Sequence, residues 1–234
     1  MKENEEKEWI KIIQPPELSY PIMEYYENSF EAIYLILNPF MLIPKHIDVY
    51  DGKHDIIRKK YVLDNAKKIS WEEVVKNKRA LDYILHKYLQ GRIDERRFSD
   101  FEGVHYDNEE IFGYLESQNI YTPLEGGFSE LLENDFLRSL LDFAYEEVYV
   151  CNEFLSKSKL INVREQINDN YIIMGEILCT PDEKIVYGAY WDGYFTLLLS
   201  EKKIIEKIVK KYNFEGFYCT KDTTIRWFED KNLI

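Results

Sequence analysis

The chain has 234 residues, of which 45% are hydrophobic and 15% are aromatic, and it carries a formal net charge of −13 at pH 7. This composition excludes a disordered chain, and the excess of acids argues against nucleic acid or an acidic membrane surface as a partner. No apolar run approaches the roughly 18–20 residues that span a bilayer, so we expect no membrane segment.

The N-terminal residues and the thiols indicate the cellular setting. Residues 1–8 are polar and charged, so we expect them to fray, and they lack the apolar stretch of a secretory signal. The three cysteines, Cys151, Cys179 and Cys219, are odd in number and widely spaced. That pattern is typical of reduced thiols rather than of a disulfide framework. We therefore expect a cytoplasmic protein.

The first part of the chain is predicted to be mainly helical after an irregular, proline-containing start. Asn28 with Glu31, and Ser70 with Glu73, have the spacing of capping boxes, which mark the beginnings of helices. Gly91 is suited to end the second of these helices. The apolar periodicity predicts helices over residues 29–37, 70–90, 108–116 and 129–145.

From Glu147 onward the pattern changes to short apolar and aromatic runs that are typical of strands. Strands are predicted over residues 148–150, 171–178, 184–190, 194–199, 214–219 and 223–228. Residues 180–183 supply a turn, and residues 201–212 form an amphipathic helix whose apolar face includes Ile208.

These elements predict an α+β fold, with a mostly helical N-terminal half and an antiparallel-sheet C-terminal half that carries one packed amphipathic helix. We assign residues 1–146 to a helical lobe and residues 147–234 to a sheet-rich lobe. The same pattern is also compatible with a single domain.

Most of the net charge lies in one segment. Between Asp94 and Glu147 there are fifteen acids and three arginines, which gives 3 − 15 = −12. A concentrated acidic surface attracts basic partners, so we expect Glu109, Glu110 and Glu116 to contact a basic protein. The alternative is that the acids only provide solubility.

Other groupings of polar residues give weaker signals. His105 and Asp107 precede Glu109 and Glu110 with a spacing that could bind a divalent cation, but it also fits an acidic helix start. No standard metal or nucleotide motif occurs, so we expect no metal or cofactor. The sequence Trp191-Asp192-Gly193 has the form of a hairpin turn. Alternatively, Trp191 and Asp192 form an exposed pair that binds a ligand or partner.

A C-terminal stretch carries a resemblance. It runs from Tyr-Gly-Ala-Tyr-Trp-Asp-Gly-Tyr-Phe-Thr-Leu at residues 187–197, through a lysine-rich helix, to Asn-Phe-Glu-Gly-Phe-Tyr at residues 213–218. This stretch resembles the C-terminal part of uncharacterised proteins from Gram-positive bacteria and, loosely, small immunity proteins. The resemblance implies no catalytic residues.

Two functional hypotheses follow. The first is a non-catalytic binding protein that engages a basic protein through its acidic surface, as the local charge indicates. The second is a small-molecule-binding protein or enzyme with an aromatic-lined cleft between the two lobes. An enzyme acting on nucleic acid ranks third, because the overall charge has the wrong sign.

Overall fold

The computed structural model describes residues 21–26, 29–44, 59–76, 115, 117–123, 126–152, 157–173, 175–189 and 193–224. The helices are α1 (Ile22–Tyr26), α2 (Lys59–Asn65), α3 (Trp71–Lys76), α6 (Glu133–Asp142), α7 (Val163–Ile167) and α8 (Lys202–Tyr212). None of them is long and apolar enough to cross a bilayer.

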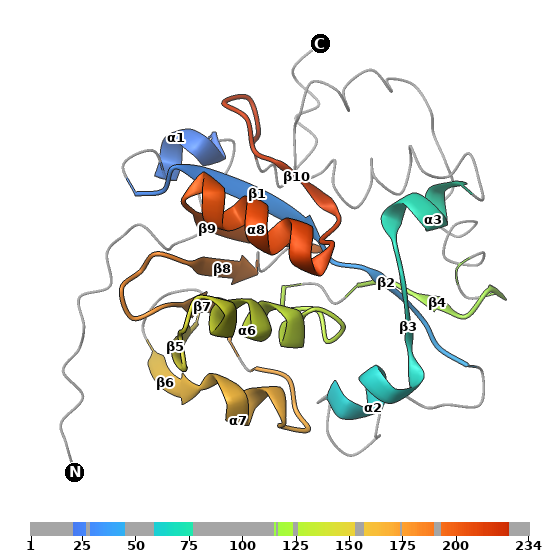
Figure 1. The fold of residues 1–234 in the computed structure, drawn as a ribbon. Helices are drawn as coiled ribbons and strands as arrows, with labels where there is room; N and C mark the ends of the chain where they lie inside the picture. The colour runs from blue at the N-terminus through green and yellow to red at the C-terminus, as the bar shows by residue number, and fades with distance from the viewer. Residues whose placement is uncertain are drawn as a thin grey trace.

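An antiparallel sheet organises the described part of the chain (Figure 1). Its strand order is β10-β1-β9-β8-β7-β5-β6. The strands are β1 (Ala32–Leu37), β5 (Glu147–Cys151), β6 (Ser158–Asn162), β7 (Ile177–Cys179), β8 (Val186–Ala189), β9 (Phe195–Ser200) and β10 (Gly216–Tyr218). A smaller sheet has the order β3-β2-β4, formed by β2 (Phe40–Leu42), β3 (Lys67–Ile69) and β4 (Ile120–Tyr121).

The large sheet is buried on both faces because alternate residues of its central strands face two separate clusters. In β1, Ile33 and Leu35 belong to one apolar cluster, whereas Tyr34 and Ile36 belong to the other. Every residue of β1 and of β9 is buried. The sequence of such strands is therefore almost continuously apolar.

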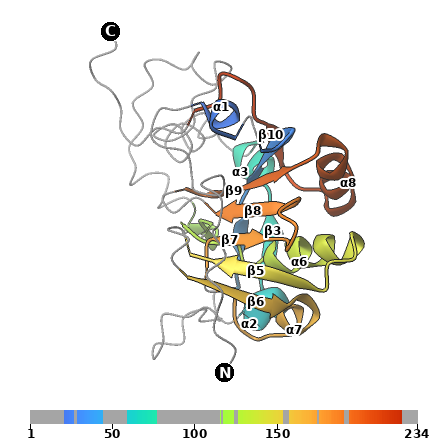
Figure 2. The same cartoon turned by 90° about the vertical axis from the view of Figure 1, so that its left-hand side faces the viewer.

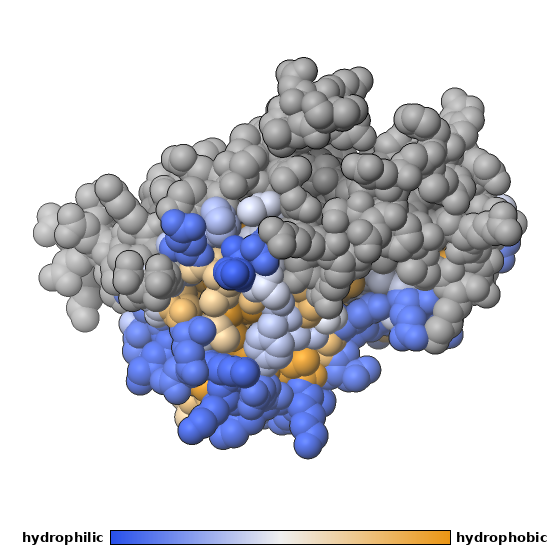
Figure 3. Space-filling model, turned by 90° about the horizontal axis from the view of Figure 1, so that it is seen from above, coloured by the Kyte–Doolittle hydropathy of each residue, from blue (hydrophilic) through white to orange (hydrophobic). Residues whose placement is uncertain are grey.

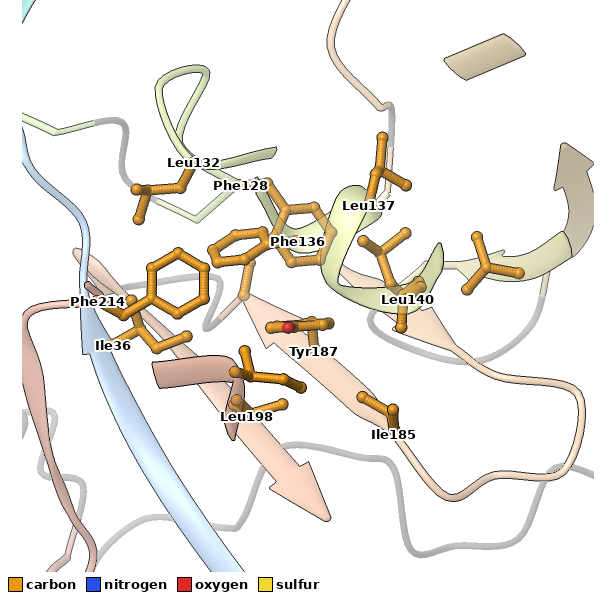
Figure 4. Close-up of a cluster of buried hydrophobic side chains, with 14 of the residues drawn as sticks. Ile36, Phe128, Leu132, Phe136, Leu137, Leu140, Ile185, Tyr187, Leu198 and Phe214 are labelled. Atoms are coloured by element: carbon orange, nitrogen blue, oxygen red, sulfur yellow. The ribbon is translucent and has the colours of Figure 1, made fainter. Parts of the chain in front are cut away.

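Helices α6, α7 and α8 cover one face of this sheet, as the edge-on view in Figure 2 shows. Phe136 of α6 stacks on Tyr187 of β8 with ring centroids 4.6 Å apart, in the cluster drawn in Figure 4. Ser139 Oγ and the Tyr187 hydroxyl lie 2.6 Å apart in a hydrogen bond that satisfies this buried phenol. Figure 3 shows one surface of the molecule, where, among the coloured residues, hydrophobic ones gather in the middle and hydrophilic ones lie mainly below and beside them.

The prediction of a mostly helical N-terminal half is wrong. Residues 32–37, predicted as part of a helix, form strand β1 between β9 and β10. A short apolar run fits a buried helix and a doubly buried strand equally well, and here the strand is formed. Within the described residues, β2, β3 and β4 add further strands before residue 122. The predicted helix over residues 108–116 and most of the helix over 70–90 lie outside the described residues.

Several elements predicted for the C-terminal half are present, but the described residues of 171–176, predicted as part of a strand, form none, and most of the strand predicted over 223–228 lies outside the described residues. Strands β5, β7, β8, β9 and β10, helix α8 and the turn at residues 181–182 all lie within or beside the predicted ranges, and so does α6. The Ser70 cap is also present, because Ser70 Oγ accepts a hydrogen bond of 3.0 Å from the Glu73 amide. Elements β6 and α7 occupy a region that the sequence indicated only as a linker. The boundary at residue 147 stays a prediction.

Candidate functional site

A cavity of about 380 Å³ lies at the β6 end of the large sheet, next to α7. This volume falls within the range of roughly 300–1,000 Å³ that is usual for small-molecule sites. Its walls combine branched apolar side chains with polar ones. The lining residues are Val150, Cys151, Asn152, Lys157, Ser158, Lys159, Ile161, Gln166, Asp169, Ile172 and Ile173.

Strands β5 and β6 form one wall of the cavity. Val150 lies opposite Lys159 in their register, and the ladder continues beyond β6 through a hydrogen bond of 3.2 Å from the Asn152 amide to the Lys157 carbonyl. The Asn152 side chain adds a second link between these two residues, because its Oδ1 accepts a hydrogen bond of 3.0 Å from the Lys157 amide. Side chains two residues apart share a face of a strand, so Lys157, Lys159 and Ile161 line up on the face of Val150.

Helix α7 and the loop after it form the opposite wall. Asn162 caps α7, since its Oδ1 accepts hydrogen bonds from the amides of Arg164 (3.0 Å) and Glu165 (3.1 Å). The loop folds back onto the helix, because Gln166 Nε2 donates to the Tyr171 carbonyl at 3.2 Å. Asp169 stabilises the same loop by accepting from the Tyr171 amide at 3.0 Å.

A buried ion pair fixes this second wall to the rest of the molecule. Lys59 Nζ of α2 lies 2.9 Å from Glu133 Oε1 of α6, and the two side chains are 1% and 0% exposed. Lys59 Nζ also donates to the Gln166 carbonyl at 2.6 Å, while the Ile173 amide donates to Glu133 Oε2 at 2.7 Å. The pair therefore joins α2 and α6 to Gln166 and Ile173, which lie on either side of the loop after α7. Helices α2 and α7 also lie near each other in Figures 1 and 2.

A second buried carboxyl group lies one turn before Glu133 and has a different environment. Within the described residues, neither oxygen of Glu130 has a hydrogen-bond partner, and the residue is 0% exposed. Burial, with a smaller contribution from the negative charge of Glu133, raises the pKa of Glu130 to about 7. Asn134 Oδ1 is also buried without a partner in this part of the structure.

The charges in the cavity differ in sign from those of the chain as a whole. Lys157 and Lys159 contribute +2 and Asp169 contributes −1, so the described lining residues sum to +1 in a protein of −13. Among the described residues, no carboxylate forms an ion pair with either lysine, whereas Asp169 is engaged by the Tyr171 amide. Polar groups beside apolar walls are a combination that is typical of ligand sites.

The structure does not place the residues that the sequence singled out as partner contacts. Glu109, Glu110, Glu116, Trp191 and Asp192 all lie outside the described residues, and so do all four histidines. In the described ranges no group of three or more His, Cys, Asp or Glu side chains is arranged to hold a metal. The three cysteines are buried thiols.

In the last third of the acidic segment, residues 94–147, most of the acids are buried or paired with a basic side chain. Six of its acids are described, and two of them, Glu130 and Glu133, are 0% exposed. Three others form ion pairs: Asp135 with Arg138 at 3.2 Å, Asp142 with Lys211 at 2.6 Å and Glu146 with Arg164 at 2.7 Å. Four of the six described acids, Glu133, Asp135, Asp142 and Glu146, therefore pair with basic side chains of the same chain.

Sequence reasoning missed the cavity because it found no elements in residues 152–170. One signal was present, since Asn162 is followed three residues later by Glu165, the spacing of a capping box. The strand that precedes it is short and polar at its start, so its apolar pattern is weak.

The sequence matches the family "Protein of unknown function (DUF2711)" over residues 19–229. The match covers nearly the whole chain, so the protein belongs to this family, and the expectation of an uncharacterised family is confirmed. No curated protein and no solved structure matches the chain. A Gram-positive origin and a likeness to immunity proteins stay predictions.

Proposed function

We propose that this member of the DUF2711 family binds a small molecule in the cavity between β6 and α7. The observation that carries the proposal is a cavity of about 380 Å³ whose apolar side chains lie beside polar groups. Such a combination is typical of ligand sites, where apolar walls provide affinity and a few polar groups fix the orientation. The described lining contains no aromatic residue, so this site differs from the aromatic cleft expected between the halves, which stays a prediction.

The buried ion pair supports the proposal because it holds the α7 wall in place before any ligand arrives. Lys59 and Glu133 reach Gln166 and Ile173, which both line the cavity, through hydrogen bonds of 2.6 and 2.7 Å. A wall that is already ordered loses less conformational entropy when a ligand binds, so binding is less costly. The buried thiols support a reducing compartment, so we keep the cytoplasm as the proposed location.

Two adjacent residues of β6 provide a test. Ile161 lines the cavity, whereas Leu160 points to the other face of the strand and is 41% exposed. Ile161→Trp should fill the cavity, and Leu160→Trp should leave it open. The small-molecule fraction of a host-cell extract is incubated with each protein, and bound compounds are identified by native mass spectrometry. We expect the wild type and Leu160→Trp to retain the same compound and Ile161→Trp to lose it.

Two results would refute the proposal. If no compound binds the wild type, or if Ile161→Trp retains it as well as the wild type does, the cavity is not a ligand site. Thermal melts of all three proteins control for misfolding, since an unfolded variant would lose binding for an unrelated reason.

We also propose, as a second function, that the acidic segment engages a basic protein. Residues 94–125 contain nine acids and two arginines, which gives 2 − 9 = −7. Electrostatic attraction mainly speeds association. A partner identified by pull-down should therefore associate more slowly with the triple variant Glu109→Gln, Glu110→Gln and Glu116→Gln, and the difference should shrink at high salt. Unchanged, salt-independent kinetics would limit the segment to a role in solubility.

A further inference from the structure

We infer that the ligand of the cavity is an amphipathic anion, with an acidic group beside an apolar portion. This inference rests on the proposed function and assigns the chemistry of its ligand. It comes from the two ammonium groups of Lys157 and Lys159, which line the cavity together with apolar side chains, outnumber its one described carboxylate, Asp169, and have no carboxylate partner among the described residues.

The arrangement of the side chains separates the two parts of such a ligand. Val150 and Ile173 are 9% and 7% exposed, so they form the deep part of the cavity. Lys157 and Lys159 are exposed, so their ammonium groups lie toward solvent. Lys159 stands directly opposite Val150 in the ladder, which brings the charged and apolar parts of the wall together. A ligand with an anionic group near the two lysines and an apolar group against Val150 and Ile173 would match both parts of the wall.

The two lysines are positive groups in a strongly acidic protein, and this bears on the charge of the ligand. A chain of net charge −13 repels anions at long range, so an anionic ligand needs a local positive group. Charges in solution are screened beyond about 8 Å at physiological ionic strength, so groups in the lining act on a bound ligand more strongly than the distant acids of the chain do. The remaining charged group of the described lining, Asp169, accepts a hydrogen bond from the Tyr171 amide but keeps its negative charge, so the three groups sum to +1.

An alternative reading of the lysines predicts a different result. Strand β6 is the last strand of the sheet, and lysines on an edge strand discourage pairing with other chains. In that case the lysines would affect aggregation but not the binding of a small anion. The two readings can therefore be separated by comparing ligands that differ only in charge.

Two fluorescent probes provide this comparison. Anilinonaphthalene sulfonate is an amphipathic anion, and N-phenyl-1-naphthylamine has the same ring system without the charge. Each probe is titrated into the wild type, into the double variant Lys157→Gln/Lys159→Gln, and into Lys202→Gln/Lys203→Gln. The last variant removes two exposed lysines of α8, outside the cavity lining, and serves as the matched control.

We expect the cavity double variant to bind the sulfonate roughly five- to thirtyfold more weakly, because each exposed charge pair contributes up to about 1 kcal/mol. Its affinity for the uncharged probe should stay within about twofold, and the α8 variant should match the wild type with both probes. Ile161→Trp should prevent both probes from binding, which locates them in the cavity. Superimposable thermal melts show that the lysine variants are folded.

The possible failures are distinguishable. If the wild type binds the uncharged probe in the cavity and the sulfonate affinity does not change in the double variant, the inference of an anionic ligand is wrong and the cavity remains a binding site. Equal losses for both probes also overturn it, because the lysines would then act through structure. If the wild type binds neither probe, or if Ile161→Trp leaves both affinities unchanged, the proposed function itself fails.

Discussion

Glu130 keeps a carboxyl group in the interior without a partner among the described residues, and this has a consequence for stability. Its pKa in the folded protein is about 7, compared with an ordinary value of 4.5, chiefly because of burial. Between pH 4.5 and 7, the folded protein therefore keeps a proton on Glu130 that the unfolded chain has already released. Stability falls as pH rises through this window, by about 3 kcal/mol in total, since one pKa unit corresponds to about 1.4 kcal/mol.

We predict that Glu130→Gln removes this pH dependence, because glutamine is neutral at every pH. The advantage of the variant over the wild type in free energy of unfolding should grow by roughly 2–3 kcal/mol between pH 5 and pH 8. Urea melts at the two pH values measure it. The same substitution at the exposed Glu147 is the control and should leave the pH profile unchanged. Parallel profiles for wild type and Glu130→Gln would show that the carboxyl is not buried as described.

The ion pair between Lys59 and Glu133 behaves differently, because both partners are buried and hydrogen-bonded. Lys59→Met leaves the Glu133 carboxylate without its cation, and we expect a loss of about 3–5 kcal/mol in free energy of unfolding. Lys67→Met breaks a 4.0 Å pair with Glu73 that is exposed on both sides, so it should cost less than about 1 kcal/mol. Equal midpoints for the two variants in urea melts would contradict this account.

At the scale of elements, α8 presents two faces with opposite tolerance for charge. Ile208 is 1% exposed and belongs to the cluster that covers the large sheet, whereas the adjacent Lys207 is exposed. Ile208→Asp buries a carboxylate without a partner, so we expect a loss of several kcal/mol, on the order of 4. Lys207→Asp should cost well under about 1 kcal/mol. Urea melts that give similar losses would mean that the helix is rotated about its axis.

The elements that could be predicted from sequence are those whose pattern has one interpretation. Helix α8 alternates apolar and charged residues with a helical period, and β9 ends before it at Ser200. Strand β1 could not be recognised, because burial on both faces removes the alternation that marks a strand. Its β-branched and aromatic residues, Ile33, Tyr34 and Ile36, were the remaining signal.

The candidate site was harder to predict than the fold, because its parts are far apart in the sequence. Lys59 and Glu133 are separated by 74 residues, and each is an ordinary surface-type residue in its own segment. Only tertiary packing brings them to Gln166 and Ile173. The cavity itself depends on β6 and α7, which are short, and short elements give weak periodic signals.

At the scale of the whole molecule, the two halves of the sequence share one sheet and one core. Strand β10 pairs with β1, and β1 also pairs with β9, so a segment from residues 32–37 lies between two C-terminal strands. Phe136, Leu137 and Leu140 of α6 pack in the same cluster as residues of β5, β8 and α8. A core that combines residues from both halves favours folding as a unit.

We therefore predict that residues 147–234 alone do not fold cooperatively. Without β1, the described part of β10 loses the strand it pairs with, and the apolar edge of β9 is exposed to water. The fragment should lack a cooperative urea transition, whereas the full chain should show one. Mixing the fragment with residues 1–146 should restore the transition if the two pieces can reassociate. A cooperative transition and a dispersed NMR spectrum for the fragment alone would instead establish residues 147–234 as an independent domain, and β1 would then be an addition to a sheet that is already stable.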